Sequence, residues 1–154
     1  MKKGIVLLCL LVCIGSLVGF LFSTKLVENS ENHGAAKVDK KNDIVGKMDE
    51  VSNLDKFEQF LNHVKSGQAD QVRIVNYTDE GDPIFQTLDY DGTNINYIFD
   101  DSNDKFGGIH KGKKRDVCRG IMKEESNEGI SYKLSECKEN HEYIGYFLLK
   151  APNE

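Results

Sequence analysis

The fold is decided by residues 84–99, which read IFQTLDYDGTNINYIF. Asp91 and Gly92 are a favoured pair for a two-residue turn between antiparallel strands, and such a turn places Leu88 opposite Ile95. Apolar and polar residues alternate along most of both arms, so one face of the hairpin is expected to be buried while the other faces water. The stretch therefore predicts a β-hairpin within an antiparallel sheet.

A further strand precedes this hairpin, and a helix precedes that strand. Residues 71–78 have a strand pattern and lead into the hairpin through the turn residues 79–82. From Ser52 to Gly67 the apolar residues repeat at helical spacing, with Ser52 as the expected N-cap and Gly67 as the C-terminal stop. Asp55 is the expected capping-box partner of Ser52. We expect this helix to cover the apolar face of the sheet.

A third hairpin places two cysteines opposite each other. With residues 126–129 as its loop, Glu125 pairs with Ile130, and the same register sets Cys118 directly across from Cys137. Cross-strand neighbours have the separation that a disulfide needs, and an exported domain meets an oxidising environment. We therefore predict a disulfide between the two cysteines, which would stabilise the domain by about 3 kcal/mol.

The N-terminal residues predict a membrane anchor. Residues 4–22 are 19 positions without a charge, and as a helix they span about 28 Å, close to the hydrocarbon core of a bilayer. Lys2 and Lys3 precede this segment and favour a cytoplasmic N-terminus, which places the rest of the chain outside. Residues 1–22 are therefore interpreted as a signal anchor, with a cleaved signal peptide or lipidation of Cys13 as the alternatives.

The composition changes after the anchor. Residues 23–50 are rich in Asn, Lys, Glu, Asp and Gly and contain few large apolar side chains, so they predict a flexible tether. Residues 51–150 then form the folded domain, on the extracytoplasmic side of the cell membrane. The chain has 20 basic and 25 acidic residues, and without Lys2 and Lys3 the acidic residues exceed the basic ones by 7. We expect so acidic a domain not to bind nucleic acid.

The sequence contains few motifs typical of catalytic or metal-binding sites. Neither a nucleophile elbow nor a zinc-protease motif occurs, so no catalytic residue is assigned. His110, Cys118, Cys137 and His141 have the residue types of a zinc site, but structural zinc sites usually contain a close cysteine pair, and 18 residues separate these two cysteines. We therefore expect neither a metal nor a cofactor.

Two connecting segments carry the candidate binding residues. Binding residues concentrate on turns and loops held by a rigid scaffold, and residues 100–115 form a long loop. The acidic residues lack the spacing of an EF-hand calcium loop, and solvated turns are their alternative interpretation. From the turn at 79–83 and from this loop we select Asp79, Glu80, Asp82, Asp104, Lys105 and Phe106.

Three segments carry a resemblance to a known family. They are residues 77–85 (YTDEGDPIF), 88–93 (LDYDGT) and 104–108 (DKFGG). Over about residues 51–149 the chain resembles an uncharacterised family of small bacterial envelope proteins, domain of unknown function 4362. The resemblance implies an exported domain, includes the cysteine pair and brings no catalytic residue. Members are often lipoproteins, but here Val12 rather than a small residue precedes Cys13.

Together these patterns predict an α+β fold in which one N-terminal helix packs on an antiparallel sheet of about six meandering strands, the last at residues 143–150. The predicted function is that of a membrane-tethered extracytoplasmic module for binding or interaction, without enzymatic activity. Its partners are then the membrane, through residues 4–22, and an envelope protein or a small ligand. A small secreted hydrolase or a metal-dependent enzyme is the alternative.

Overall fold

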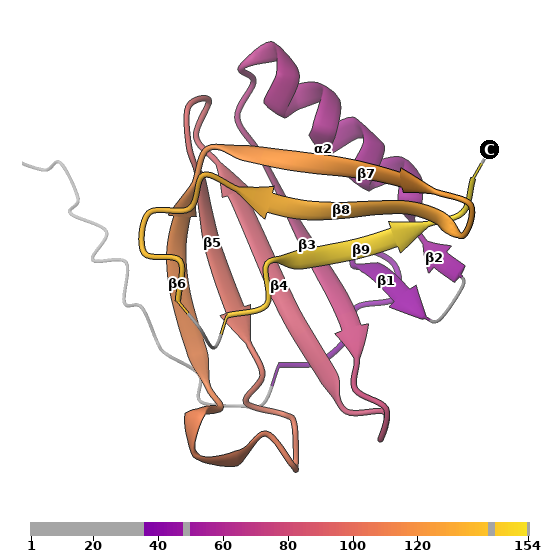
Figure 1. The fold of residues 1–154 in the computed structure, drawn as a ribbon, viewed down its shortest axis with the longest axis vertical. Coiled ribbons are helices and arrows are strands. Elements are labelled where there is room, and N and C mark those ends of the chain that lie inside the picture. The colour runs from indigo at the N-terminus through magenta and orange to yellow at the C-terminus, as the bar shows by residue number, and fades with distance from the viewer. Residues whose placement is uncertain (1–35, 48–49, 142–143, 154) are drawn as a thin grey trace, which may run out of the picture. The chain divides into compact units, whose positions relative to one another are not determined.

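The computed structural model describes residues 36–47, 50–141 and 144–153, which excludes the predicted anchor and Cys13 (Figure 1). Among the helices of these residues, none has the length and apolar character to cross a membrane. The elements follow one another as β1 (Ile44–Lys47), β2 (Glu50–Ser52), α2 (Leu54–Ser66), β3 (Asp70–Tyr77), β4 (Pro83–Tyr90), β5 (Ile95–Asp100), the 3-10 helix η1 (Gly108–His110), β6 (Lys113–Cys118), β7 (Gly120–Ser126), β8 (Gly129–Ser135) and β9 (Phe147–Ala151).

The strands form two sheets. The first has the order β2-β1-β3-β4-β5-β6, with β1 parallel to β3 and the other neighbouring pairs antiparallel. The second has the order β7-β8-β9 and is antiparallel. The predicted α+β fold is confirmed in part, since the described part of the chain is mostly β and contains one α-helix, which precedes most of the strands. The prediction of a single antiparallel sheet is wrong, because the chain builds a mixed sheet and a separate three-stranded sheet.

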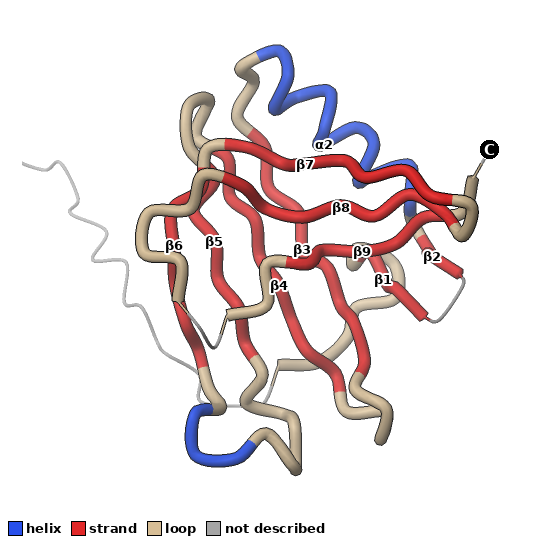
Figure 2. Tube along the Cα trace, viewed as in Figure 1, coloured by secondary structure: helices blue, strands red, loops and turns tan. Residues whose placement is uncertain are grey.

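The second sheet lies across the first, as Figure 2 shows. The chain leaves the first sheet at Cys118, the last residue of β6, and joins the second at Gly120, the first residue of β7. The predicted register of the third hairpin is confirmed, since Glu125 lies opposite Ile130. Such a register pairs residues across a hairpin but does not reveal that the chain changes sheets at Arg119.

The central hairpin has a longer turn than predicted. Leu88 lies opposite Tyr97, so the register is shifted by two residues. The Asp91 carboxylate accepts hydrogen bonds at 2.8 Å from the backbone N–H groups of Thr93 and Asn94, and the Asp91 N–H donates to the Asn94 carbonyl. These bonds stabilise a wider turn. Because the shift is by an even number of residues, the side chains keep their predicted faces.

Helix α2 begins differently from the prediction. Asn53 occupies the N-cap position in the left-handed conformation, with a φ of 58°, and its side chain makes no capping hydrogen bond. The side-chain amide of Asn53 instead donates to the carbonyls of Lys40, at 3.2 Å, and Asp43, at 2.6 Å. The predicted capping box of Ser52 and Asp55 is therefore wrong, because the chain before the helix is tied to residues 40–43.

The apolar face of α2 packs into the core as predicted. Phe57 and Phe60 are fully buried, and the Phe57 ring meets Tyr132 of β8 edge-on with 5.0 Å between ring centroids. Gly67 ends the helix at a φ of 73°, in the left-handed region that favours glycine. The helix thus contacts side chains of both sheets and closes one side of a shared core.

The predicted disulfide between Cys118 and Cys137 is confirmed. The two Cα atoms are 3.9 Å apart, and Cys118 is fully buried. Cys118 ends β6 in the first sheet, whereas Cys137 follows β8 in the second. The disulfide therefore links the two sheets where the chain passes from one to the other.

The first sheet also includes residues of the predicted tether. Strand β1 lies between β2 and β3, and its first residue, Ile44, is fully buried. Asp43 is 2% exposed and accepts hydrogen bonds from the Arg73 guanidinium at 2.7 and 2.8 Å. A strand of four residues needs few apolar side chains, so the polar composition of residues 23–50 conceals it.

Candidate functional site

Predicted binding residues lie in two loops at one end of the first sheet. Residues 78–82 connect β3 to β4, and residues 101–112 connect β5 to β6 (Figure 1). We call these two segments together the loop surface. The structure brings Asp82 of the first segment into contact with Lys105 of the second.

Asp82 joins the two segments. Its side chain is 8% exposed, and its carboxylate accepts hydrogen bonds from the Lys105 ammonium group at 2.8 Å and the Lys105 backbone N–H at 2.9 Å. These two hydrogen bonds hold the pKa of Asp82 below its usual value, and Asp82 raises the pKa of Lys105. The Asp82 carboxylate is therefore a charged bridge between the loops, and its oxygens are already engaged.

Two further aspartates hold residues 101–112 in one conformation. Asp101 accepts hydrogen bonds from the Gly112 N–H at 2.6 Å and from the Lys114 ammonium group at 3.2 Å. Asp104 accepts a hydrogen bond from the Phe106 N–H at 2.8 Å. These contacts connect the beginning of the loop to its end and shape its tip. The Asp101 and Asp104 carboxylates thus accept hydrogen bonds from backbone N–H groups of the loop and from Lys114 of β6.

The tip of the loop presents apolar side chains to solvent. Phe106 is 74% exposed and Ile109 is 93% exposed, the two largest values for a big hydrophobic side chain in the described residues. Asp79 and Glu80 are also exposed, in the turn at 78–82. Sequence reasoning missed Ile109, although a β-branched residue within a loop of Gly, Lys and Asp is a signal that could have identified it.

A second polar cluster surrounds Asp116 of β6. Its carboxylate accepts hydrogen bonds from the N–H groups of Val117 at 2.7 Å, Glu139 at 3.0 Å and Asn140 at 3.0 Å, and from the Tyr146 hydroxyl at 2.5 Å. Burial raises the pKa of Asp116, but these hydrogen bonds outweigh it and leave the pKa below its usual value. Burial and the bond to Asp116 raise the pKa of Tyr146 to about 12. Asp116 is therefore an ionised anchor for the segment that leads into β9.

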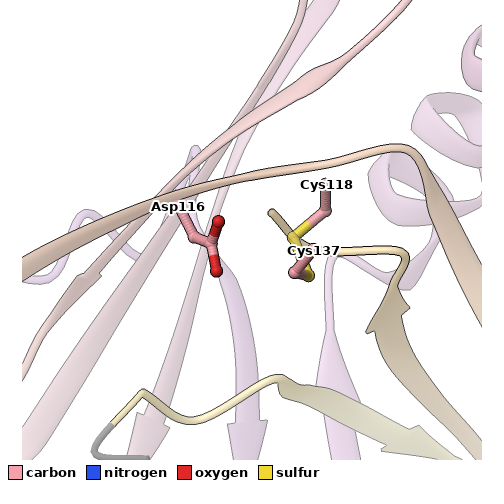
Figure 3. A group of neighbouring side chains, drawn as sticks. All are labelled: Asp116, Cys118 and Cys137. Carbon is pink, nitrogen blue, oxygen red and sulfur yellow. A yellow bond between two sulfur atoms is a disulfide. The ribbon is translucent and has the colours of Figure 1, made fainter. Parts of the chain in front are cut away.

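Asp116 also lies beside the disulfide, as Figure 3 shows. An Asp116 oxygen and the sulfurs of Cys118 and Cys137 lie within 4.8 Å of one another. Zinc is bound by thiolates, however, and these sulfurs are bonded to each other. In the part of the chain that is described, His110 and His141 do not belong to this group. As long as the disulfide is formed, Cys118 and Cys137 cannot act as the zinc ligands of the site considered from the sequence.

A polar cleft of about 660 Å³ lies beside Arg73. The Arg73 guanidinium donates to Asp43 and to the Lys37 carbonyl, the latter at 3.0 Å, and lies 5.1 Å from the centre of the Phe85 ring. The Arg73 guanidinium is therefore engaged by residues 37 and 43 and holds this N-terminal segment against β3. The other side chains of the cleft come from that segment, α2, β3 and β4 and include Asp39, Asn42, Lys56, Gln59, Asp70 and Thr87.

These features define a class of protein, a disulfide-bonded domain whose described residues form two sheets and one α-helix and whose buried polar clusters have structural roles. Residues 41–133 match the family described as Domain of unknown function (DUF4362), and the chain belongs to this family. The match confirms the family inferred from the sequence, and the matched segment includes β1, in agreement with the place of that strand in the fold. Neither a curated protein nor a solved structure matches the chain.

Proposed function

We propose that this protein is a membrane-tethered extracytoplasmic module that binds a partner without enzymatic activity, and that the loop surface is its contact surface. The observation that carries the proposal is the exposure of Phe106 and Ile109 on a loop whose conformation is held by Asp82 and Asp101. Apolar side chains gain free energy when they leave water, and an ordered loop loses little conformational entropy when it binds. A fixed apolar tip is therefore suited to contact.

The location is supported by the sequence and by the cysteines. Residues 4–22 have the length and apolar character of a membrane-spanning helix, and two lysines precede them. The disulfide between Cys118 and Cys137 is typical of domains outside the cytoplasm, where thiols are oxidised. Both observations favour a domain that is held at the outer side of a membrane.

The alternative, a small secreted hydrolase or metal-dependent enzyme, has less support. A general acid or base that works near neutral pH needs a pKa shifted towards that value. Hydrogen bonds instead place the pKa values of Asp82 and Asp116 below the usual value of a carboxyl group. The described residues offer no specific observation in favour of an enzyme.

Site-specific photo-crosslinking in intact cells tests the binding role. A photoreactive amino acid replaces Phe106 in the full chain, and the matched control replaces Met122, which is 48% exposed on β7. We expect a defined adduct, identified by mass spectrometry, from position 106 and not from position 122. Equal adducts at both positions, or none at either, would contradict the assignment of the loop surface as a contact surface.

The mass of the mature chain tests the location. An intact N-terminus in the membrane fraction supports the signal anchor, whereas loss of the N-terminal segment indicates cleavage, and an added acyl chain on Cys13 indicates lipidation. Protein recovered from the cytoplasm with Cys118 and Cys137 reduced would contradict an extracytoplasmic location.

A further inference from the structure

We infer that the loop surface contacts the lipid bilayer to which the chain is tethered, with Phe106 and Ile109 inserted among the lipid headgroups. The inference rests on the proposed function, because it names the partner of the same surface. The partner is a phospholipid surface, to which proteins bind through inserted apolar area and through charge.

The described chain begins beside the loop surface. The side-chain amide of Asn103, within the β5–β6 loop, donates a hydrogen bond to the Ala36 carbonyl at 3.0 Å. Figure 1 shows the indigo start of the described chain at the same end of the first sheet as this loop. The N-terminal segment therefore joins the domain at the end that carries Phe106 and Ile109.

Little chain separates this point from the predicted anchor. Residues 23–35 are the 13 residues between the apolar segment and Ala36. A chain of this length spans at most about 45 Å, and a random coil of this length spans about 20 Å on average. A tether this short gives the loop surface a high effective concentration next to the bilayer. A weak intrinsic affinity of the loop for lipid is then sufficient for contact.

The side chains of the tip suit the membrane interface. Phe106 and Ile109 supply apolar surface; Lys105 in the loop and Lys113 at the start of β6 have side chains that are 76% and 65% exposed. Long lysine side chains can lay their apolar stems along buried surface while their ammonium groups stay at the level of the headgroups. Because aspartates balance the lysines of this loop, apolar insertion supplies most of the attraction. We therefore expect contact with zwitterionic as well as anionic lipid.

The size of the apolar patch favours lipid over a protein partner. Protein partners in stable complexes bury about 800 Å² each, over roughly 20 or more residues. Within residues 36–47, 50–141 and 144–153, the strongly exposed apolar surface is two side chains on one loop. Other exposed hydrophobic side chains, such as Val117, Met122 and Phe147, are more than half buried and belong to strands. A bilayer needs no complementary shape, so a small projecting tip is enough.

The absence of tryptophan from the sequence permits a direct test. Full-length Phe106→Trp protein is reconstituted into vesicles of phosphatidylcholine, alone or mixed with phosphatidylglycerol, with Met122→Trp as the matched control. Lipids brominated in their acyl chains quench a tryptophan that enters the bilayer. We expect the tryptophan at position 106 to emit at shorter wavelength and to be quenched at least about twofold more than that at position 122, in both kinds of vesicle.

A second substitution separates insertion from proximity. Ile109→Ser in the Phe106→Trp protein removes apolar area from the tip, so we expect weaker quenching. The thermal unfolding midpoint should stay unchanged, because Ile109 is 93% exposed. Equal quenching at positions 106 and 122, or quenching that Ile109→Ser leaves unchanged, would overturn the inference.

The two proposals fail differently. If Phe106→Trp is not quenched while crosslinking from position 106 captures a protein or a small molecule, the lipid inference falls and the binding role stands. If the emission of the Phe106→Trp protein shifts to shorter wavelength with rising protein concentration in the absence of lipid, the loop surface contacts a second copy of this chain and the lipid inference falls. If quenching and crosslinking are both absent, both proposals fall.

Discussion

At the residue scale, aspartate side chains organise much of the backbone. Asp91 accepts two backbone N–H groups in the β4–β5 turn, Asp104 accepts one in the β5–β6 loop, and Asp116 accepts three near the disulfide. Hydrogen bonds from N–H groups favour the ionised carboxyl group, and they lower the pKa of Asp91. Some of the many acidic side chains therefore hold the backbone in place, in addition to those that only contact solvent.

Asp116→Asn should weaken the fold and change its response to acid. The substitution disturbs four hydrogen bonds at a buried site, so we expect a loss of about 1–3 kcal/mol in the free energy of unfolding at pH 7, measured by urea denaturation. Because the folded pKa of Asp116 lies below the unfolded value, its contribution is present above pH ~4 and is lost as the pH falls through the folded pKa.

The stability of Asp116→Asn should therefore fall less steeply than that of the wild type below pH ~4. Asp89→Asn, at an exposed position of β4, is the matched control and should follow the wild type. Parallel acid curves for Asp116→Asn and the wild type would contradict the role of the Asp116 carboxylate.

At the scale of single elements, the start of α2 depends on one left-handed residue. Asn53 combines a φ of 58° with two side-chain hydrogen bonds to the segment before β1. Asn tolerates this conformation better than most residues, whereas alanine pays a steric cost of about 1 kcal/mol that glycine avoids. Asn53 therefore both sets the direction of the chain and ties α2 to its neighbour.

Asn53→Ala should accordingly be less stable than Asn53→Gly by about 1 kcal/mol, and both should be less stable than the wild type, because both lose the two hydrogen bonds. Chemical denaturation measures the three free energies of unfolding. Asn62→Ala, at an exposed position inside the same helix, should be neutral or slightly stabilising. An alanine variant as stable as the glycine variant would show that the left-handed backbone is not costly at position 53.

The link between the two sheets is the second element with a clear test. Replacing Cys118 and Cys137 together with alanine should cost about 3 kcal/mol, because the disulfide closes a segment with a sequence separation of 19. Each single alanine variant should lose a similar amount, since either change removes the same bond. Urea unfolding of the wild type with and without a reductant is the control, and an identical midpoint in both would contradict the stabilising role.

At the scale of the whole molecule, the N-terminal segment completes the fold. Strand β1 adds the only parallel pair among the described strands, and Ile44 enters the core between the helix and the sheets. The Arg73 guanidinium binds the Asp43 carboxylate just before this strand. Removal of this segment would open the β3 edge of the first sheet and leave Arg73 without that partner.

A chain that begins at residue 51 should therefore be less stable than one that begins at residue 36, by at least about 3 kcal/mol. Circular dichroism and urea unfolding of the two chains measure the difference. The Ile44→Ala variant of the longer chain is the control for the loss of one core side chain and should lose about 2–5 kcal/mol. Equal stability of the two chains would mean that the folded unit does begin near residue 51.

The features that could be predicted from the sequence depend on patterns within a few residues or across one hairpin. The apolar spacing before Gly67 and the common register of Glu125–Ile130 and Cys118–Cys137 are of this kind. The buried polar clusters were harder to predict, because Asp43 and Asp116 each meet partners 30 positions away, in Arg73 and Tyr146 respectively. Single polar residues separated by that distance carry no periodic signal that relates them.

The sequence alone therefore predicts the helix, the alternating faces of the hairpins and the cysteine pair, because periodicity and local register suffice for these. The family follows from the resemblance of whole sequence segments. The tertiary structure decided three other features. Strand β1 joins the first sheet beside β3, the chain changes sheets at Arg119, and the start of the domain meets the loop surface through Asn103. These features depend on contacts between segments far apart in sequence, whose favourable free energy arises only when the whole core is assembled.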